Sequence, residues 1–191
     1  MERPYGACRQ EAGYGLIEIR LQSVGQLFNS LDPAPFHEKD IDRDAEAYIV
    51  ESVRELPRAM PLKLLVHVPE AERAAAEAAN VTDAIQHYFD YRRWAEQAAL
   101  HRLLAQGRLA ALIGLLFLVA CMGAREIVLS LGDGAPSRLV GEGLMIIGWV
   151  AMWRPVEIFL YDWWPIRRMR DIYGKIARTP VEIRAGGEAR R

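Results

Sequence analysis

The sequence predicts an α-helical transmembrane hairpin joined to a small cytoplasmic α/β domain. Charged residues make up 26% of the 191-residue chain, but residues 109–123, LAALIGLLFLVACMG, and residues 143–153, GLMIIGWVAMW, contain none. Outside these two segments, the chain shows the alternating and helical apolar patterns of an ordinary globular domain. This uneven distribution of charge divides the chain into a polar domain and a pair of apolar helices.

The α/β domain is expected over residues 1–80. Apolar side chains alternate in residues 16–21, LIEIRL, and again in residues 62–68, LKLLVHV, as they do in strands. Between these segments, residues 41–56 repeat apolar side chains at helical spacing. We therefore expect a β-α-β unit with a right-handed crossover. The carboxy-terminal segment PVEIR, residues 180–184, alternates in the same way and is a candidate third strand.

A continuous juxtamembrane helix is expected over residues 81–108, leading directly into the hairpin of residues 109–154. Residues 109–131 form the first expected span and residues 138–153 form most of the second. A span needs about 20 mostly apolar residues, because the hydrocarbon core is about 30 Å thick. The connection LGDGAPS has the composition of a turn. A buried soluble hairpin is the alternative, but soluble helices normally keep a polar face.

Basic residues predict the orientation of this hairpin. Those flanking its open end are Arg92, Arg93, Arg102 and Arg108 before the first span, and Arg154, Arg167, Arg168, Arg170, Lys175 and Arg178 after the second. The region of the turn offers only Arg125 and Arg138. The positive-inside rule therefore places both termini in the cytoplasm, and the first thirty residues lack the apolar core of a secretory signal peptide. The expected location is the bacterial inner membrane.

The segment from residue 155 to residue 191 is expected to be an aromatic and basic helix in the membrane interface, followed by a cytoplasmic tail. Pro155 lacks a backbone donor and favours a bend. Tryptophan and arginine favour the headgroup level, which predicts contact with anionic lipids. The expected interface anchors are Trp153, Trp163, Trp164, Arg167, Arg168 and Arg170. A straight continuation of the second span through residues 155–164 is the alternative.

Three charges lie within or beside the second apolar segment: Glu142, Arg154 and Glu157. Arg154 and Glu157 are three residues apart and can pair on one helix face. Glu142 is a candidate proton or ion site. The alternative, favoured by its position near the start of the helix, is a carboxylate that reaches water and pairs with Arg125 or Arg138.

The segment QLFNSLDPAPF, residues 26–36, combines apolar and polar side chains in one loop. A role in packing is one interpretation, in which its leucines and phenylalanines cover the open face of the sheet. The alternative is a loop that docks a partner or ligand, because polar groups stand in an apolar frame. The docking candidates are Phe28, Asn29, Ser30, Asp32 and Phe36.

Catalytic and metal-binding patterns are weak. Asp40, Asp42 and Asp44, with Glu51 at the twelfth position, copy the acidic spacing of an EF-hand loop, but Ala45 replaces the required glycine. Helix capping explains these carboxylates better. The four histidines lack the spacing of a metal pair. We expect no catalytic residue, no metal, no cofactor and no nucleic-acid binding, although a membrane-tethered enzyme using His37, Glu38 and Asp40 is a minor alternative.

Together, QLFNSLDPAPF, the acidic helix after it and WRPVEIFLYDWWPIRR resemble segments of an uncharacterised family of small bacterial two-span membrane proteins. The resemblance covers most of the chain and implies the two-span topology, but no activity. The expected role is a non-enzymatic anchor, scaffold or accessory subunit whose cytoplasmic domain binds an unknown protein partner. A homo-oligomer is left open, and the alternative role is a subunit of an oligomeric transporter or channel.

Overall fold

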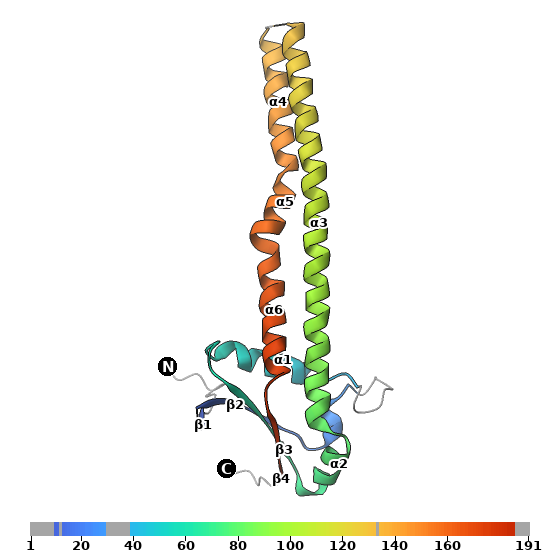
Figure 1. Cartoon of the computed structure of the whole chain (residues 1–191), viewed down its shortest axis with the longest axis vertical. Coiled ribbons are helices and arrows are strands. Elements are labelled where there is room, and N and C mark those ends of the chain that lie inside the picture. The colour runs from blue at the N-terminus through green and yellow to red at the C-terminus, as the bar shows by residue number, and fades with distance from the viewer. Residues whose placement is uncertain (1–9, 12, 30–38, 133, 186–191) are drawn as a thin grey trace. The chain divides into compact units, whose positions relative to one another are not determined.

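The computed structural model describes residues 10–11, 13–29, 39–132 and 134–185 (Figure 1). The chain divides into two compact units, one formed by residues 1–95 with 169–191 and the other by residues 96–168. The first unit is an α/β domain and the second is a helical hairpin. Two helices belong to both units, and the parts of these helices are described below with the unit in which they lie.

A four-stranded sheet forms the base of the α/β unit. Its strands are β1 (Gln10–Glu11), β2 (Tyr14–Arg20), β3 (Leu62–Val68) and β4 (Val181–Ala185), in the spatial order β1-β2-β3-β4. Strands β2, β3 and β4 are mutually parallel, whereas β1 is antiparallel to β2. The expected β-α-β unit and the third strand from the carboxy terminus are therefore confirmed. The two-residue strand β1 was not predicted.

Helices cover one face of this sheet. Helix α1 (Arg43–Glu55) connects β2 to β3, and the parts of α3 (Val81–Leu131) and α6 (Trp163–Ile176) that belong to this unit lie in the same core. The central strand contributes deeply buried side chains, since Leu64 and Val66 are at most 1% exposed. Ile49 of α1, Phe89 of α3 and Ile176 of α6 pack in the same cluster.

The acidic residues before α1 cap this helix. The Asp42 side chain accepts a hydrogen bond from the Asp44 backbone N–H at 2.9 Å, and Asp44 and Glu46 lie in the first turn. A carboxylate there satisfies a free amide and interacts favourably with the helix dipole. The helix ends at Glu55, two residues before Pro57. The capping role expected for these residues is therefore the one observed.

The short elements η2 (Glu70–Glu72) and α2 (Arg73–Ala78) lead into α3. Asn80 separates α2 from α3 with a left-handed φ of 45°, a conformation that asparagine tolerates better than most residues. From Val81 the helix then runs unbroken for 51 residues to Leu131. The predicted continuity between the juxtamembrane helix and the first apolar segment is confirmed.

The returning helix is interrupted at Met152, three residues before the proline at which a bend was expected. Helix α4 (Ala135–Ala151), α5 (Trp153–Glu157), the π-helical turn η3 (Ile158–Asp162) and α6 follow one another as a nearly continuous helix. Pro155 is buried, and the next backbone N–H, that of Val156, donates to Met152 at 3.3 Å. Helix α4 ends before Met152, and Pro155 lies in the first turn of α5, where the missing N–H of proline disrupts a helix least.

Small residues form the seam along which the two helices of the hairpin pack. On α3 the buried positions recur every seven residues, at Leu100, Gly107, Gly114 and Cys121. On the returning helix, Gly141, Gly148 and Pro155 are buried with the same spacing. A Cβ atom added at Gly114 would lie 2.9 Å from the carbonyl oxygen of Ala151, and one added at Gly148 would lie 2.9 Å from Leu118 Cδ1. The helix backbones therefore approach as closely as glycine permits.

We predict that Gly114→Ala destabilises the hairpin, because its methyl group meets a backbone oxygen that cannot rotate away. Gly123→Ala on the same helix is the matched control, since a Cβ there meets nothing within 4 Å. Thermal unfolding of the full chain in mild detergent should show a lower midpoint for Gly114→Ala. The midpoint should be unchanged or higher for the control, because alanine favours helix. Equal midpoints for the two variants would contradict the close seam.

Candidate functional site

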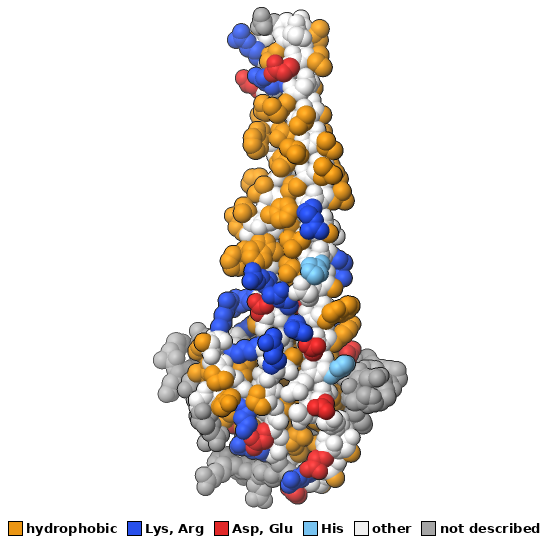
Figure 2. Space-filling model, in the orientation of Figure 1, with side chains coloured by type: hydrophobic (Ala, Val, Ile, Leu, Met, Phe, Trp, Pro, Cys, Tyr) orange, Lys and Arg blue, Asp and Glu red, His pale blue; other side chains and the backbone are white. Residues whose placement is uncertain are grey.

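The surface of the hairpin unit is predominantly apolar (Figure 2). Two helices, Val81–Ser130 and Ala135–Ile176, are long and apolar enough to cross a membrane. In their most apolar windows only 11% and 17% of the residues are buried. Large exposed side chains include Leu112, Leu116 and Val119 of α3, and Ile146, Trp149 and Val150 of α4. A core helix of a soluble protein would be mostly buried, so this exposure requires an apolar environment or a partner.

Of the described charges near the turn of the hairpin, Glu126, Arg138 and Glu142 are exposed and Arg125 is partly exposed. Arg125 Nη1 donates to the Oε1 atom of the adjacent Glu126 at 2.6 Å, and the Arg125 stem lies beside Gly141. Glu142 is exposed, and its expected pairing with Arg125 or Arg138 is not among the ion pairs of the described residues. Helix α4 begins at Ala135, so Glu142 lies about two turns into the helix, farther from its start than the sequence suggested.

Arg154 is the centre of a group of charges on the returning helix. It contacts two carboxylates, at 3.2 Å from Glu157 and 3.0 Å from Asp162. The indole Nε1–H of Trp153 donates to the other oxygen of Glu157 at 2.9 Å. The pairing of Arg154 with Glu157 expected from their spacing is present, and Asp162 is a second partner that the spacing did not predict. The π turn at Ile158–Asp162 brings Asp162 within reach of Arg154.

The predicted aromatic anchors lie together just after this turn. The rings of Trp163 and Trp164 are 4.8 Å apart, and the guanidinium of Arg167 lies 5.5 Å from the Trp163 ring. The Trp163 indole N–H donates to the Phe159 carbonyl at 2.9 Å, whereas Trp164 is 62% exposed. Arg168 is exposed on the same helix. Arg170 belongs to the α/β unit and pairs with Asp171 at 2.7 Å.

The predicted docking loop lies only partly within the described residues. Phe28 is 3% exposed, belongs to the core and forms an isolated bridge with Ile41. The backbone N–H of Asn29 donates to the Asp40 carbonyl at 2.8 Å. Phe28 therefore has the packing role that the first interpretation of the loop expected, and Asn29 has a backbone role. Ser30, Asp32 and Phe36 lie outside the described residues.

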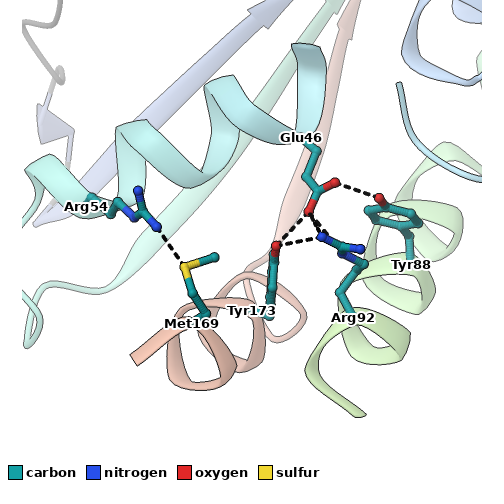
Figure 3. A network of polar contacts seen from close by, with 6 residues as sticks. All are labelled: Glu46, Arg54, Tyr88, Arg92, Met169 and Tyr173. Atoms are coloured by element: carbon teal, nitrogen blue, oxygen red, sulfur yellow. Dashed lines mark hydrogen bonds and ion pairs between the residues drawn. The ribbon is translucent and has the colours of Figure 1, made fainter. Parts of the chain in front are cut away.

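A polar cluster that sequence reasoning did not identify joins three helices of the α/β unit (Figure 3). Glu46 of α1 accepts hydrogen bonds from the hydroxyls of Tyr88 on α3, at 2.8 Å, and Tyr173 on α6, at 2.7 Å. Arg92 of α3 donates to Glu46 at 3.0 Å through Nε and to the Tyr173 hydroxyl at 3.0 Å. The Arg92 guanidinium also lies 5.3 Å from the Tyr173 ring centre. We call Glu46, Tyr88, Arg92 and Tyr173 the polar clasp.

The polar clasp is partly withdrawn from water. Burial raises the pKa of the Tyr88 phenol, and its hydrogen bond to Glu46 raises it further. The pKa of Tyr173 is raised for the same two reasons, although Arg92 opposes the shift. Both hydroxyls therefore remain protonated donors in neutral solution. The cluster has the chemistry of a structural fastening, since both tyrosine hydroxyls and two nitrogens of the Arg92 guanidinium donate to acceptors inside it.

The sequence alone did not predict the polar clasp. Tyr88 occupies a position in an apolar helical stripe, and Glu46 looks like another first-turn carboxylate. Tyr173 comes from a segment separated from both by the whole hairpin. Buried polar groups require partners, but the spacing along the chain does not show which residues meet.

The described residues offer no evident metal site. Among the described residues, no group of three or more histidine, cysteine, aspartate and glutamate side chains could hold a metal ion. His67 Nε2 lies 3.8 Å from Glu18 across the sheet.

No protein-family model, curated protein or solved structure matches the chain. The family resemblance carried by its two aromatic segments therefore remains an expectation.

We predict that Glu46→Ala destabilises the α/β unit by about 1–3 kcal/mol, because two hydroxyls and a guanidinium lose their shared acceptor. Glu46→Gln, which keeps one carbonyl acceptor, should cost less. The matched control is Glu51→Ala, which removes an exposed carboxylate from the same helix. Amide hydrogen exchange of α1 in the full chain measures the effect. Similar exchange in Glu46→Ala and Glu51→Ala would show that the polar clasp does not fasten α1.

Alkaline pH should weaken the same fastening. The pKa of each clasp tyrosine is raised in the folded protein above the value of about 10 for an unfolded chain. Ionisation therefore favours the unfolded state, so this contribution is fully present below about pH 10 and is lost as the pH rises above it. Thermal unfolding followed by circular dichroism should show this loss. The double variant Tyr88→Phe, Tyr173→Phe should be less stable at neutral pH but should depend less on alkaline pH; an unchanged dependence would rule out these tyrosines as its source.

Proposed function

We propose that this protein is a two-span membrane anchor that holds a small α/β domain at the cytoplasmic face of a bacterial inner membrane. The observation that carries the proposal is the apolar surface of the hairpin unit. Its two helices bury their small residues against each other and direct their large apolar residues outward. Lipid is the environment that matches this arrangement, because in lipid, helices associate through small residues and expose large ones.

The length of the apolar surface supports a spanning arrangement. Residues 109–124 of α3 carry no charge and correspond to about 24 Å of helix. This is shorter than the hydrocarbon core of about 30 Å, but Arg108 and Arg125 flank the segment. Their long side chains can extend toward the headgroups, which accommodates a short hydrophobic segment.

Paired charges support the same arrangement for the returning helix. Arg154 lies between two carboxylates, so its charge is compensated within the helix itself. Charged groups at membrane depth are normally paired, since an isolated charge is costly there. Trp163 and Trp164, with Arg167 beside them, match the composition of a cytoplasmic interface. In this proposal residues 154–162 remain beside α3, and the anchors Trp163, Trp164 and Arg167 lie beyond them.

The α/β domain is the part proposed to meet a protein partner. The domain is a small sheet covered by helices, and the polar clasp fastens three of these helices to one another within it. The partner surface is proposed to lie on the domain and not on Phe28, which is buried in its core.

We predict that Ser130 lies outside the membrane and Glu51 lies in the cytoplasm. Both residues are exposed, so each can be replaced by cysteine in a Cys8→Ser, Cys121→Ser background. A membrane-impermeant maleimide should label the Ser130→Cys variant in intact cells. It should label Glu51→Cys only after permeabilisation.

Alkaline carbonate extraction is the companion measurement for membrane insertion. The chain should stay in the membrane pellet, because the hairpin is inserted and not bound through surface charge alone. Release into the supernatant would contradict the proposed function. Labelling of Glu51→Cys in intact cells would instead contradict the orientation and leave insertion standing.

A further inference from the structure

Strand β4 is the last strand of the sheet in the described part of the chain (Figure 1). It pairs with β3 in parallel, with Leu64 opposite Val181 and Val66 opposite Ile183. Within the part of the chain that the structure describes, no strand pairs with its other side. An open edge presents unpaired backbone donors and acceptors, which can pair with another strand.

The pairing with β3 determines which backbone groups face outward. The Leu64 N–H donates to the Pro180 carbonyl at 3.0 Å, and Leu64 lies opposite Val181. In a parallel ladder, the N–H and C=O groups of one residue point to the same neighbouring strand, and those of the next residue point to the opposite side. Pro180, Glu182 and Arg184 therefore direct theirs toward β3. The residues that direct their N–H and C=O groups to the open edge are Val181, Ile183 and Ala185.

The side chains of β4 alternate between the two faces of the sheet. Val181 and Ile183 pack against the core but remain partly exposed at the edge. Glu182 and Arg184 project from the opposite face of the sheet. Their side chains contact each other at 2.7 Å, and Lys63 of β3 also pairs with Glu182. The edge therefore carries one negative and one positive side chain, two residues apart.

We propose that the β4 edge binds the β4 edge of a second copy of this chain, as an antiparallel pair centred on Ile183. In this register Ile183 lies opposite Ile183 of the second copy, and Val181 lies opposite Ala185. Every outward N–H and C=O group of the three residues then has a partner. The interface is isologous, as the commonest dimers are.

The charges of Glu182 and Arg184 favour this register over the registers on either side of it. Centring on Ile183 places each Glu182 opposite the Arg184 of the other copy. These are non-hydrogen-bonded positions, where side chains on adjacent antiparallel strands are closest. Moving the centre by one residue would place Glu182 opposite Glu182, or Arg184 opposite Arg184. Like charges directly opposite each other are destabilising, so the sequence VEIRA is complementary to itself in one register.

Lys63 is compatible with the dimer. It approaches Glu182 from β3, whereas Arg184 of the second copy would approach from the open edge. Glu182 would then lie between two cations from adjacent strands. The opposite edge of the sheet does not offer an equivalent surface, because β1 has only two residues.

Directed crosslinking tests the register in native membranes. Two differently tagged full-length chains, Glu182→Cys in one and Arg184→Cys in the other, are co-expressed in the Cys8→Ser, Cys121→Ser background and oxidised. A disulfide between the two tags is expected, since opposed residues at non-hydrogen-bonded positions lie within its reach. Glu182→Cys alone should crosslink at least several-fold less, and Glu51→Cys on α1 should not crosslink. Failure of the mixed pair, or a stronger Glu182→Cys self-crosslink, would overturn the proposal.

Charge reversal gives an independent test by measuring dimer mass in detergent. Arg184→Glu alone and Glu182→Arg alone should each raise the dissociation constant of their own dimer about tenfold, because both cross-strand pairs become repulsive. A mixture of the two variants should form a mixed dimer, since both of its pairs are attractive. Circular dichroism and protease resistance equal to those of the unchanged chain show that each variant is folded. Folded variants that fail to form the mixed dimer would overturn the proposal even if the hairpin is inserted in the membrane.

Discussion

The pairing of β3 with β4 is the constraint on which the rest of the structure depends. Leu64 to Val68 lie beside Val181 to Ala185, although the entire hairpin separates them in the sequence. The central strand of the sheet is therefore completed only when the chain has left the α/β unit and returned to it. The hairpin must bring its two ends close together, and the glycine seam is what allows α3 and the returning helix to do so.

The polar clasp supports the same closure by a different kind of interaction. The sheet pairs backbone groups, whereas Glu46 collects hydrogen bonds from side chains on α3 and α6. The β3–β4 pairing and the hydrogen bonds of Tyr173 join residues far apart in the chain, so neither can form early from local structure alone. Glu46 meets Tyr88 and Arg92 across 42 and 46 positions, a separation like that between β2 and β3. The α/β unit is therefore built from a first half, which includes the contacts of Glu46 with α3, and a returning half, which adds Tyr173 and β4.

The sequence predicted the elements better than it predicted their contacts. Alternation identified β2, β3 and β4, and the uncharged run after Leu109 identified the apolar part of α3, because each pattern reflects burial along one element. The interruption expected at Pro155 lies at Met152, with Pro155 in the first turn of the next helix, and the course of this segment into the interface stays a prediction. Phe28 was left between packing and docking, because an apolar side chain in a loop looks the same in both. Glu46, Tyr88, Arg92 and Tyr173 were missed because their relation exists only in three dimensions.

The glycine seam also has a consequence for what the hairpin can enclose. Where Gly114 meets the Ala151 backbone and Gly148 meets Leu118, there is no room even for an added methyl group. A water-filled path needs polar walls and a width of at least one molecule, and the space between these two helices has neither. In a bilayer the hairpin would therefore act as one narrow solid rod that displaces few lipids. Any path for ions or solutes would have to lie between several such rods and be lined by their outer faces.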